Sequence, residues 1–140
     1  YFCPDVPSMK KNPAFFFFPD GFSKPYPFTP TLAVSIDDVF DEKVKAIDAL
    51  ESQVYEGGAL GDETTRAKRF GDDPVRRIEA LKKTWSNRHA GIADKHRETL
   101  LQWYGEEAGK AVRHAEAFEL CEYGSRPSNE QLKLLFPFFP

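Results

Sequence analysis

The chain has 140 residues, the length of one ordinary domain, and its 19 Lys and Arg against 22 Asp and Glu give a net charge of −3. This balance excludes a polycation that coats nucleic acid, and the absence of a run of about 18 apolar residues predicts no membrane partner. Two cysteines are too few for a disulfide scaffold and fit a reducing, cytoplasmic location. A hydrophobic content of 41% is enough for a folded core.

Residues 1–30 differ from the rest of the chain in composition. They hold nine of the 20 aromatic residues and seven of the 11 prolines, which predicts an extended segment. Within it, residues 14–18 (AFFFF) form a short apolar run that we interpret as a strand. Successive strand side chains point to opposite faces, so we expect the strand in the interior of a sheet covered on both faces. The composition also leads us to expect a piece of a longer protein.

Residues 31–55 predict a strand followed by a helix. Thr31–Ile36 is rich in β-branched residues, and Asp37-Asp38 is expected to cap a helix whose apolar residues recur every three or four positions. Gly57-Gly58 is expected to end that helix. A strand, a carboxylate cap and a helix open a βα unit, which favours an α/β fold.

Residues 56–73 are rich in glycine and charge, which is typical of an exposed loop. Residues 74–140 then predict a long helix, a strand and a short terminal helix. Asp73-Pro74 starts the long helix, because proline is favoured at the first helical position, and Gly105 breaks it.

The end of the chain carries three further elements. Glu106–Val112 predicts one or two helical turns, and Ala117–Tyr123 predicts a strand. Ser128 and Gln131 form a capping box for a last helix that ends near Phe136.

Residue spacing indicates no catalytic residue and no metal ligand in this chain. His89 and His96 lie seven positions apart on the apolar face of the long helix, whereas two metal ligands on one helix normally lie three or four apart. We interpret both as packing residues. His114 has no neighbouring Cys or His, and Cys3 and Cys121 have no local histidine that would activate a thiolate.

Several stretches resemble the PIG-L/LmbE-like zinc-dependent N-deacetylases. Residues 35–54 (SIDDVFDEKVKAIDALESQV) resemble that family's I-D-x-V-F-x-x-K-x-x-A-x-x-x-H-x-S-Q segment, and residues 111–119 (AVRHAEAFE) resemble its A-V-x-Y-A-E-A-F-E segment. The similarity extends to residues 121–124 (CEYG), to the ending at 127–138 and to the Pro- and Phe-rich opening. It spans most of this chain but only the C-terminal half of a family member.

The resemblance implies a Rossmann-like α/β fold and zinc-dependent removal of an N-acetyl group from a small glucosamine-type glycoconjugate. The family's zinc ligands and general base lie in H-P-D-D and H-P-D-H motifs, and this chain contains neither. We therefore expect residues 1–140 to be the C-terminal portion of one deacetylase domain, supplying several strands, one long helix and one wall of the substrate cleft. The expected partners are the N-terminal part of the same protein, which would hold the zinc, and a second copy in a homo-oligomer. Alone, the chain is expected to be inactive.

Glu116 and Gln53 are the substrate-cleft candidates that the resemblance implies. Glu116 matches the A-E-A-F glutamate, and its alternative role is a surface carboxylate at a strand edge. Gln53 matches the family's glutamine, with a helix-to-loop hydrogen bond as its alternative. Two positions depart from the family, because Leu50 replaces a histidine and His114 replaces a tyrosine. The rival function is a non-enzymatic protein-interaction module that docks through its Pro/aromatic segment.

Overall fold

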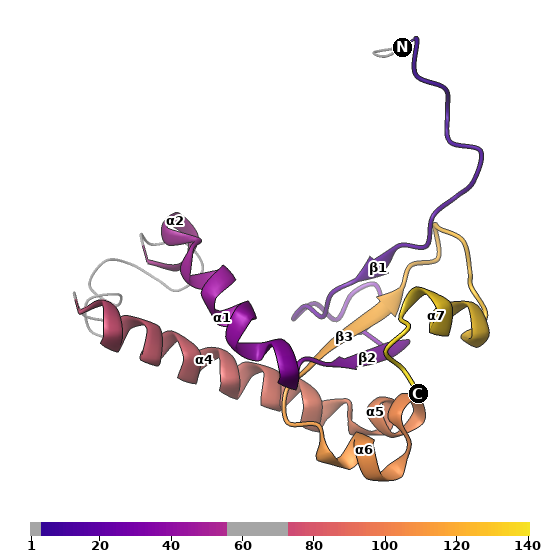
Figure 1. Cartoon of the computed structure of the whole chain (residues 1–140). Coiled ribbons are helices and arrows are strands. Elements are labelled where there is room, and N and C mark those ends of the chain that lie inside the picture. Colours follow the sequence, from indigo (N-terminus) through magenta and orange to yellow (C-terminus); the bar gives the residue numbers. More distant parts are fainter. Residues whose placement is uncertain (1–3, 56–72) are drawn as a thin grey trace. The chain divides into compact units, whose positions relative to one another are not determined.

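The structure is a computed structural model that describes residues 4–55 and 73–140 (Figure 1). The chain is a mixed α/β protein, as the sequence predicts. In chain order its described elements are β1 (Phe16–Phe17), β2 (Leu32–Ser35), the short 3-10 helix η1 (Asp37–Val39), α1 (Phe40–Asp48), α2 (Glu51–Val54), α4 (Pro74–Lys95), α5 (Arg97–Tyr104), α6 (Glu106–Ala111), β3 (Ala115–Leu120) and α7 (Asn129–Leu135). None of the described helices is both long enough and apolar enough to cross a membrane.

The described strands form a three-stranded antiparallel sheet in the order β1–β3–β2. A Rossmann-like sheet consists mainly of parallel strands, and that arrangement stays a prediction for this chain. In this sheet β1 is an edge strand, so the interior position predicted for the Phe-rich strand requires further strands of a longer protein and stays a prediction. It pairs with β3 through only two residues, Phe16 opposite Leu120 and Phe17 opposite Glu119.

The chain divides into two compact units. The aromatic unit consists of residues 1–32 and 117–140, and the helical unit consists of residues 33–116. In the aromatic unit, backbone hydrogen bonds join the N-terminal segment to the chain after β3, from Cys121 N to Phe15 O and from Ser125 N to Pro13 O. Gly124 is required at this crossing, because a Cβ there would lie 2.6 Å from the Pro13 carbonyl oxygen.

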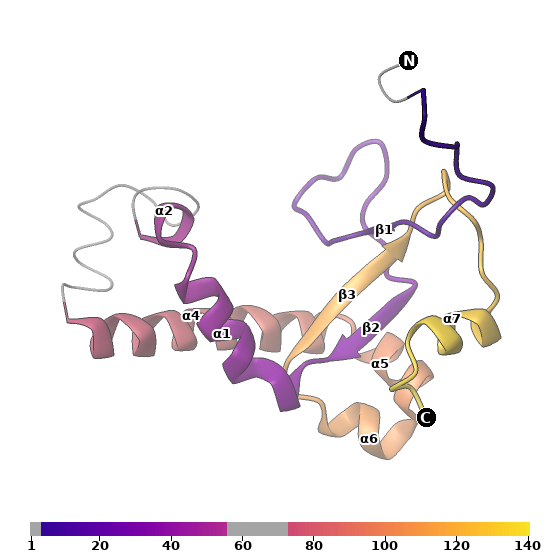
Figure 2. The same ribbon diagram turned by 45° about the horizontal axis from the view of Figure 1, so that its top comes forward.

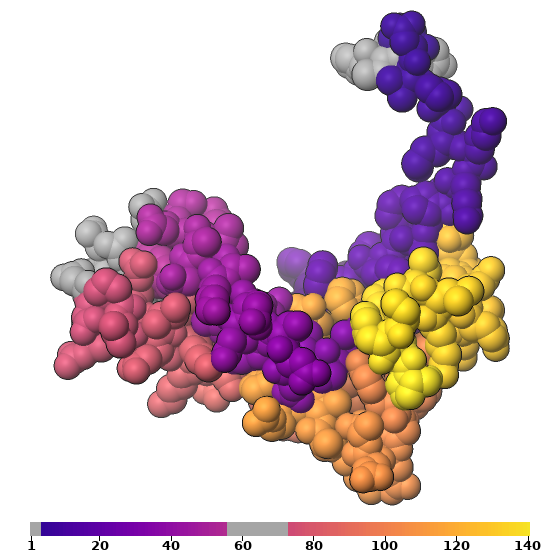
Figure 3. All heavy atoms as spheres, in the orientation of Figure 1, coloured from indigo at the N-terminus to yellow at the C-terminus, as the bar shows by residue number. Residues whose placement is uncertain are grey.

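Helix α7 begins as predicted, since Ser128 and Gln131 form a reciprocal capping box. After it, the rings of Phe136, Phe138 and Phe139 pack against one another. Phe136 also meets Phe16 of β1 edge to face, with the ring centroids 5.5 Å apart. Figure 3 shows this C-terminal segment (yellow) beside the N-terminal segment (indigo).

The helical unit has its first core between α1, α2 and α4, and Figure 2 shows α1 running across α4. Phe40, Val44 and Val54 lie on the helical face that the periodicity predicts, and Leu81 is completely buried, but Val39 and Leu50 of the same predicted face are exposed. The members are Ile36, Phe40, Val44, Val54, Tyr55 and Leu81. A second cluster joins β2, α4, α5, the residue after α6 and the start of β3. It consists of Ala33, Ala93, Leu100, Val112 and Ala115.

Several helix and strand boundaries differ from the prediction. The expected single helix from Asp37 is divided into η1, α1 and α2, and its predicted end at Gly57-Gly58 lies outside the described residues. The long helix begins at Pro74 with the Asp73 carboxylate accepting from Val75 N, as predicted, but α4 ends at Lys95 and α5 continues from Arg97. Gly105 breaks the helix with a φ of +79°, a conformation that favours glycine. The predicted strand at 117–123 lies two to three residues earlier, at Ala115–Leu120.

Candidate functional site

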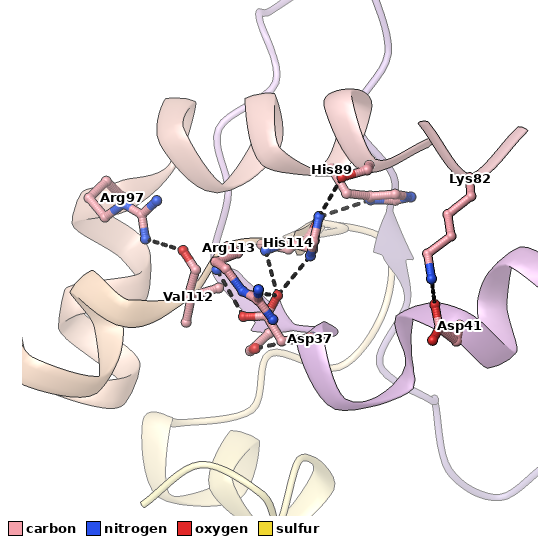
Figure 4. A network of polar contacts seen from close by, with 11 residues as sticks. Asp37, Asp41, Lys82, His89, Arg97, Val112, Arg113 and His114 are labelled. Atoms are coloured by element: carbon pink, nitrogen blue, oxygen red, sulfur yellow. Dashed lines mark hydrogen bonds and ion pairs between the residues drawn. The ribbon is translucent and has the colours of Figure 1, made fainter. Parts of the chain in front are cut away.

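The densest polar contacts of the helical unit converge on Asp37, the first residue of η1 (Figure 4). Its Oδ2 accepts a hydrogen bond from Arg113 N at 2.8 Å. Its Oδ1 accepts from His114 N at 2.9 Å and from His114 Nδ1 at 2.8 Å. The prediction that Asp37 caps its own helix is therefore wrong. The carboxylate accepts hydrogen bonds from the residues just before β3 and makes no capping hydrogen bond to η1. Asp37 thus fixes the position of residues 113–114 relative to η1.

The electrostatics of this contact keep Asp37 ionised near neutral pH. Burial by itself raises the pKa of Asp37, but the hydrogen bonds from Arg113 and His114 outweigh it and lower the pKa below its usual range. Because an ionised carboxylate can only accept, His114 Nδ1 must carry the proton in this hydrogen bond. In neutral His114 the other ring nitrogen, Nε2, then holds a free electron pair.

Ser86 of α4 completes the contacts of the His114 ring. Ser86 Oγ lies 2.8 Å from His114 Nε2 and donates to it in the tautomer that Asp37 imposes. The imidazole stacks on Phe40 with the ring centroids 4.3 Å apart and the planes 11° apart. His114 and Asp37 expose 14% and 17% of their side chains, and Ser86 is half-buried. One face of the helical unit therefore carries a hydrogen-bonded Ser–His–Asp arrangement.

His89 lies close by in the core and confirms the interpretation of a packing residue. It is buried, its ring stacks on Trp85, and its Nδ1 donates to Ala115 O at 3.0 Å. Its Nε2 and the Trp85 Nε1 have no hydrogen-bond partner in the described part of the chain. His96 is also buried. Burial lowers the pKa of both His89 and His96, so both rings are neutral near pH 7.

The two residues that the resemblance singles out lie apart from this arrangement. Glu116, on β3, is half-buried, and its Oε1 lies 2.5 Å from Lys43 Nζ of α1. Gln53, on α2, is exposed, and no hydrogen bond joins its side chain to Glu116. The structure therefore gives Glu116 a cationic partner and leaves Gln53 at the surface.

The aromatic unit contains a concave surface. It is a groove of about 880 Å³ between residues 11–16 and 125–136, lined by Phe16, Leu134, Leu135 and Phe136 and by the cationic Lys11 and Arg126. Cys121 is buried in the same unit, and Cys3 lies outside the described residues. Within residues 4–55 and 73–140, His, Cys, Asp and Glu side chains form no group of three that would hold a metal ion.

Comparisons with protein-family models, with curated proteins and with solved structures find no match to this chain. The function is therefore inferred from the geometry and from the sequence resemblance.

Sequence reasoning missed Asp37 and Ser86 as partners of His114. Asp37 and His114 are separated by 77 positions, and Ser86 and His114 by 28, so no local motif joins them. Such arrangements are recognised by geometry and not by sequence order. The one signal in the sequence is His114 itself, a polar ring where the similar family has tyrosine.

Proposed function

We propose that this chain forms part of a zinc-dependent N-deacetylase similar to the PIG-L/LmbE-like enzymes, acting on a glucosamine-type glycoconjugate. One observation carries the proposal beyond the sequence resemblance. The two resembling stretches, 35–54 and 111–119, contact each other directly, through Asp37 with Arg113 and His114 and through Lys43 with Glu116. Residues that give the family its sequence pattern are thereby also the residues that hold this region together.

Glu116 is the residue that we assign to the wall of the substrate cleft. A carboxylate accepts hydrogen bonds from sugar hydroxyls, and Lys43 balances its charge while leaving acceptor positions free. About a quarter of the Glu116 side chain is exposed, since its relative accessibility is 24%. Gln53 is the second candidate, because its exposed amide can both donate and accept.

Zinc is assigned to a different part of the enzyme. The described residues do not fit a zinc site, and both ring nitrogens of His114 are already engaged by Asp37 and Ser86. In the full-length enzyme the metal would polarise the acetyl carbonyl and lower the pKa of its bound water. Residues 1–140 alone are therefore expected to show no deacetylase activity.

The proposal is tested on the parent protein with zinc and an N-acetylglucosamine conjugate, by measuring amine release. We expect zinc-dependent turnover, and we expect Glu116→Gln to lower kcat/KM by roughly tenfold or more through lost substrate contacts. Glu119→Gln is the matched control, because Glu119 lies on the same strand and its carboxylate accepts from Thr29 N.

Three results would contradict the proposal at different levels. A parent gene without H-P-D-D and H-P-D-H motifs would overturn the deacetylase function. Zinc-dependent turnover that is equal in Glu116→Gln and the parent protein would overturn only the role of Glu116. Amine release by residues 1–140 alone, abolished by a chelator, would show that the zinc ligands are in this chain.

A second function, a protein-interaction module, is favoured by the aromatic unit. Phe15, Phe17 and Phe18 each expose about half or more of their surface, which is unusual for a large apolar side chain. Affinity capture with residues 1–140 would distinguish the two functions. A stoichiometric partner that is not a deacetylase polypeptide would favour the interaction module.

A further inference from the structure

We propose that Ser86, His114 and Asp37 form a nucleophilic acyl-transfer site that accepts small carboxylic esters without a metal. This inference goes beyond the proposed deacetylase function, since it uses residues of this chain alone and no zinc. All three residues belong to the helical unit, on α4, before β3 and on η1.

The distances meet the requirements of a serine nucleophile with a histidine base. The Ser86 Oγ to His114 Nε2 and His114 Nδ1 to Asp37 Oδ1 distances are both 2.8 Å, inside the range of about 2.6–3.2 Å for such contacts. The contacts also follow the order that catalysis requires. The carboxylate binds Nδ1, so Nε2 faces the hydroxyl as a proton acceptor. The third group thus orients the base, and the base contacts the nucleophile.

The arrangement is held in place before any substrate binds. Asp37 is fixed by two backbone N–H groups, of Arg113 and His114, in addition to the ring. Phe40 covers one face of the imidazole and fixes its plane. A histidine that only packs in the core does not need a carboxylate on one ring nitrogen and a hydroxyl on the other. His89 is an example, because its Nδ1 donates to a backbone carbonyl and its Nε2 has no hydrogen-bond partner in the described residues.

The chemistry balances without a further reactant except water. Ser86 Oγ attacks the ester carbonyl carbon, its proton passes to His114 Nε2, and an Oγ–C bond forms. The ester C–O bond breaks, and the alcohol leaves with the proton from Nε2. Water then attacks the acyl-serine, gives its proton to Nε2, and the carboxylic acid leaves as Ser86 Oγ regains a proton.

The Arg113 guanidinium lies at the Asp37 end of the arrangement (Figure 4). Its side chain is 77% exposed, and its Nε lies 3.9 Å from Asp37 Oδ1. It therefore adds positive charge beside the ionised carboxylate that orients His114.

The test treats the protein, in the presence of a chelator, with a fluorophosphonate probe and maps the label by peptide mass spectrometry. Oγ of the reacting serine forms a bond to phosphorus, fluoride leaves, and the serine proton is released through the base. We expect one label per chain, on Ser86, and a burst of p-nitrophenol from p-nitrophenyl acetate of about one equivalent.

Ser86→Ala is expected to abolish both signals. Thr84→Ala is the matched control, because the Thr84 hydroxyl lies on the same helix and donates only to Ala80 O of that helix. His114→Gln is expected to slow labelling of Ser86 at least tenfold, with far-ultraviolet circular dichroism reporting whether the variant is folded.

A folded protein whose Ser86 stays unlabelled would overturn the proposal. So would an acetate burst that persists in Ser86→Ala. The first result does not depend on the folding of any variant, because it is read on the unmodified protein. Both are also independent of deacetylase activity, which the chelator removes.

Discussion

The helical unit and the aromatic unit contain similar kinds of apolar residue but bury them to different degrees. In the helical unit Leu81, Ala93 and Leu100 are completely buried. In the aromatic unit Phe18 and Phe22 expose 65% and 77% of their surfaces. The difference follows from local structure, because helices present a continuous apolar stripe to one another, whereas a Pro-rich segment cannot form a helix that would cover its own aromatic rings. Aromatic content alone therefore does not make a core.

The largest expected effect comes from removing a core side chain of the helical unit. Leu81→Ala deletes a completely buried side chain between α1 and α4 and is expected to lower the free energy of unfolding by about 2–5 kcal/mol. Leu134→Ala, the matched change in the aromatic unit, is expected to stay within about 0.5 kcal/mol because Leu134 is exposed. Urea unfolding followed by circular dichroism measures both. Equal losses would show that the contrast between the units is wrong.

A smaller effect is expected within β1, where neighbouring phenylalanines differ. Phe16 contacts Phe118 and Phe136, whereas Phe17 exposes about half of its surface. Phe16→Thr is expected to destabilise the aromatic unit by about 1–2 kcal/mol, which is part of the burial energy of a phenylalanine. Phe17→Thr is expected to leave stability unchanged and to raise solubility, since it removes exposed apolar surface.

Binding of a dye specific for apolar surface provides the readout for this pair. Phe17→Thr should bind less dye than the unmodified chain, and Phe16→Thr should bind at least as much. A chain that binds no dye before mutation would mean that another copy covers these rings, as the expected homo-oligomer would.

Local signals in the sequence predicted local structure well. The Asp73 cap, the Gly105 break and the Ser128–Gln131 capping box each depend on residues within a few positions, and all three are confirmed. The division of the long helix at His96 was not predictable, because the apolar stripe continues through it. Contacts between residues far apart in the sequence could not be predicted either. The clearest case is Asp37, which is predicted to cap its own helix but binds Arg113 and His114.

The Phe-rich run shows a different limit of sequence reasoning. Alternation along a strand indicates which side chains share a face, but not whether anything covers that face. The prediction of a strand is confirmed for Phe16 and Phe17, which lie at the edge of the described sheet, and the interior position stays a prediction for the longer protein. The substrate-cleft roles of Glu116 and Gln53 stay predictions, because they depend on a ligand.

A pH effect is expected in the helical unit and comes from groups with lowered pKa. His89 and His96 titrate below the unfolded value of about 6.5, so their contribution to stability is complete above that pH and is lost as pH falls through their folded pKa. The lowered pKa of Asp37 acts in the same direction at lower pH. Its contribution to stability is complete above about pH 4 and is lost as the pH falls further. Nuclear magnetic resonance titration of the ring signals should show both histidines neutral at a pH where a free histidine peptide is half protonated. Titration of either ring at the free-peptide value would contradict its burial.

The smallest effect is expected from an ion pair at the surface of the helical unit. Lys82 Nζ lies 2.5 Å from Asp41 Oδ1, but both side chains are more than half exposed, whereas those of Lys43 and Glu116 are about a quarter exposed. Water and salt screen exposed charges, so Lys82→Met should change the melting temperature less than Lys43→Met does. Raising sodium chloride to about 1 M shortens the screening length to about 3 Å and should abolish any effect of Lys82→Met. The Lys43→Met effect should persist in salt, because that substitution leaves the half-buried Glu116 without its partner. If salt removes both effects equally, the Lys43–Glu116 pair is as well solvated as the surface pair and does not anchor β3 to α1.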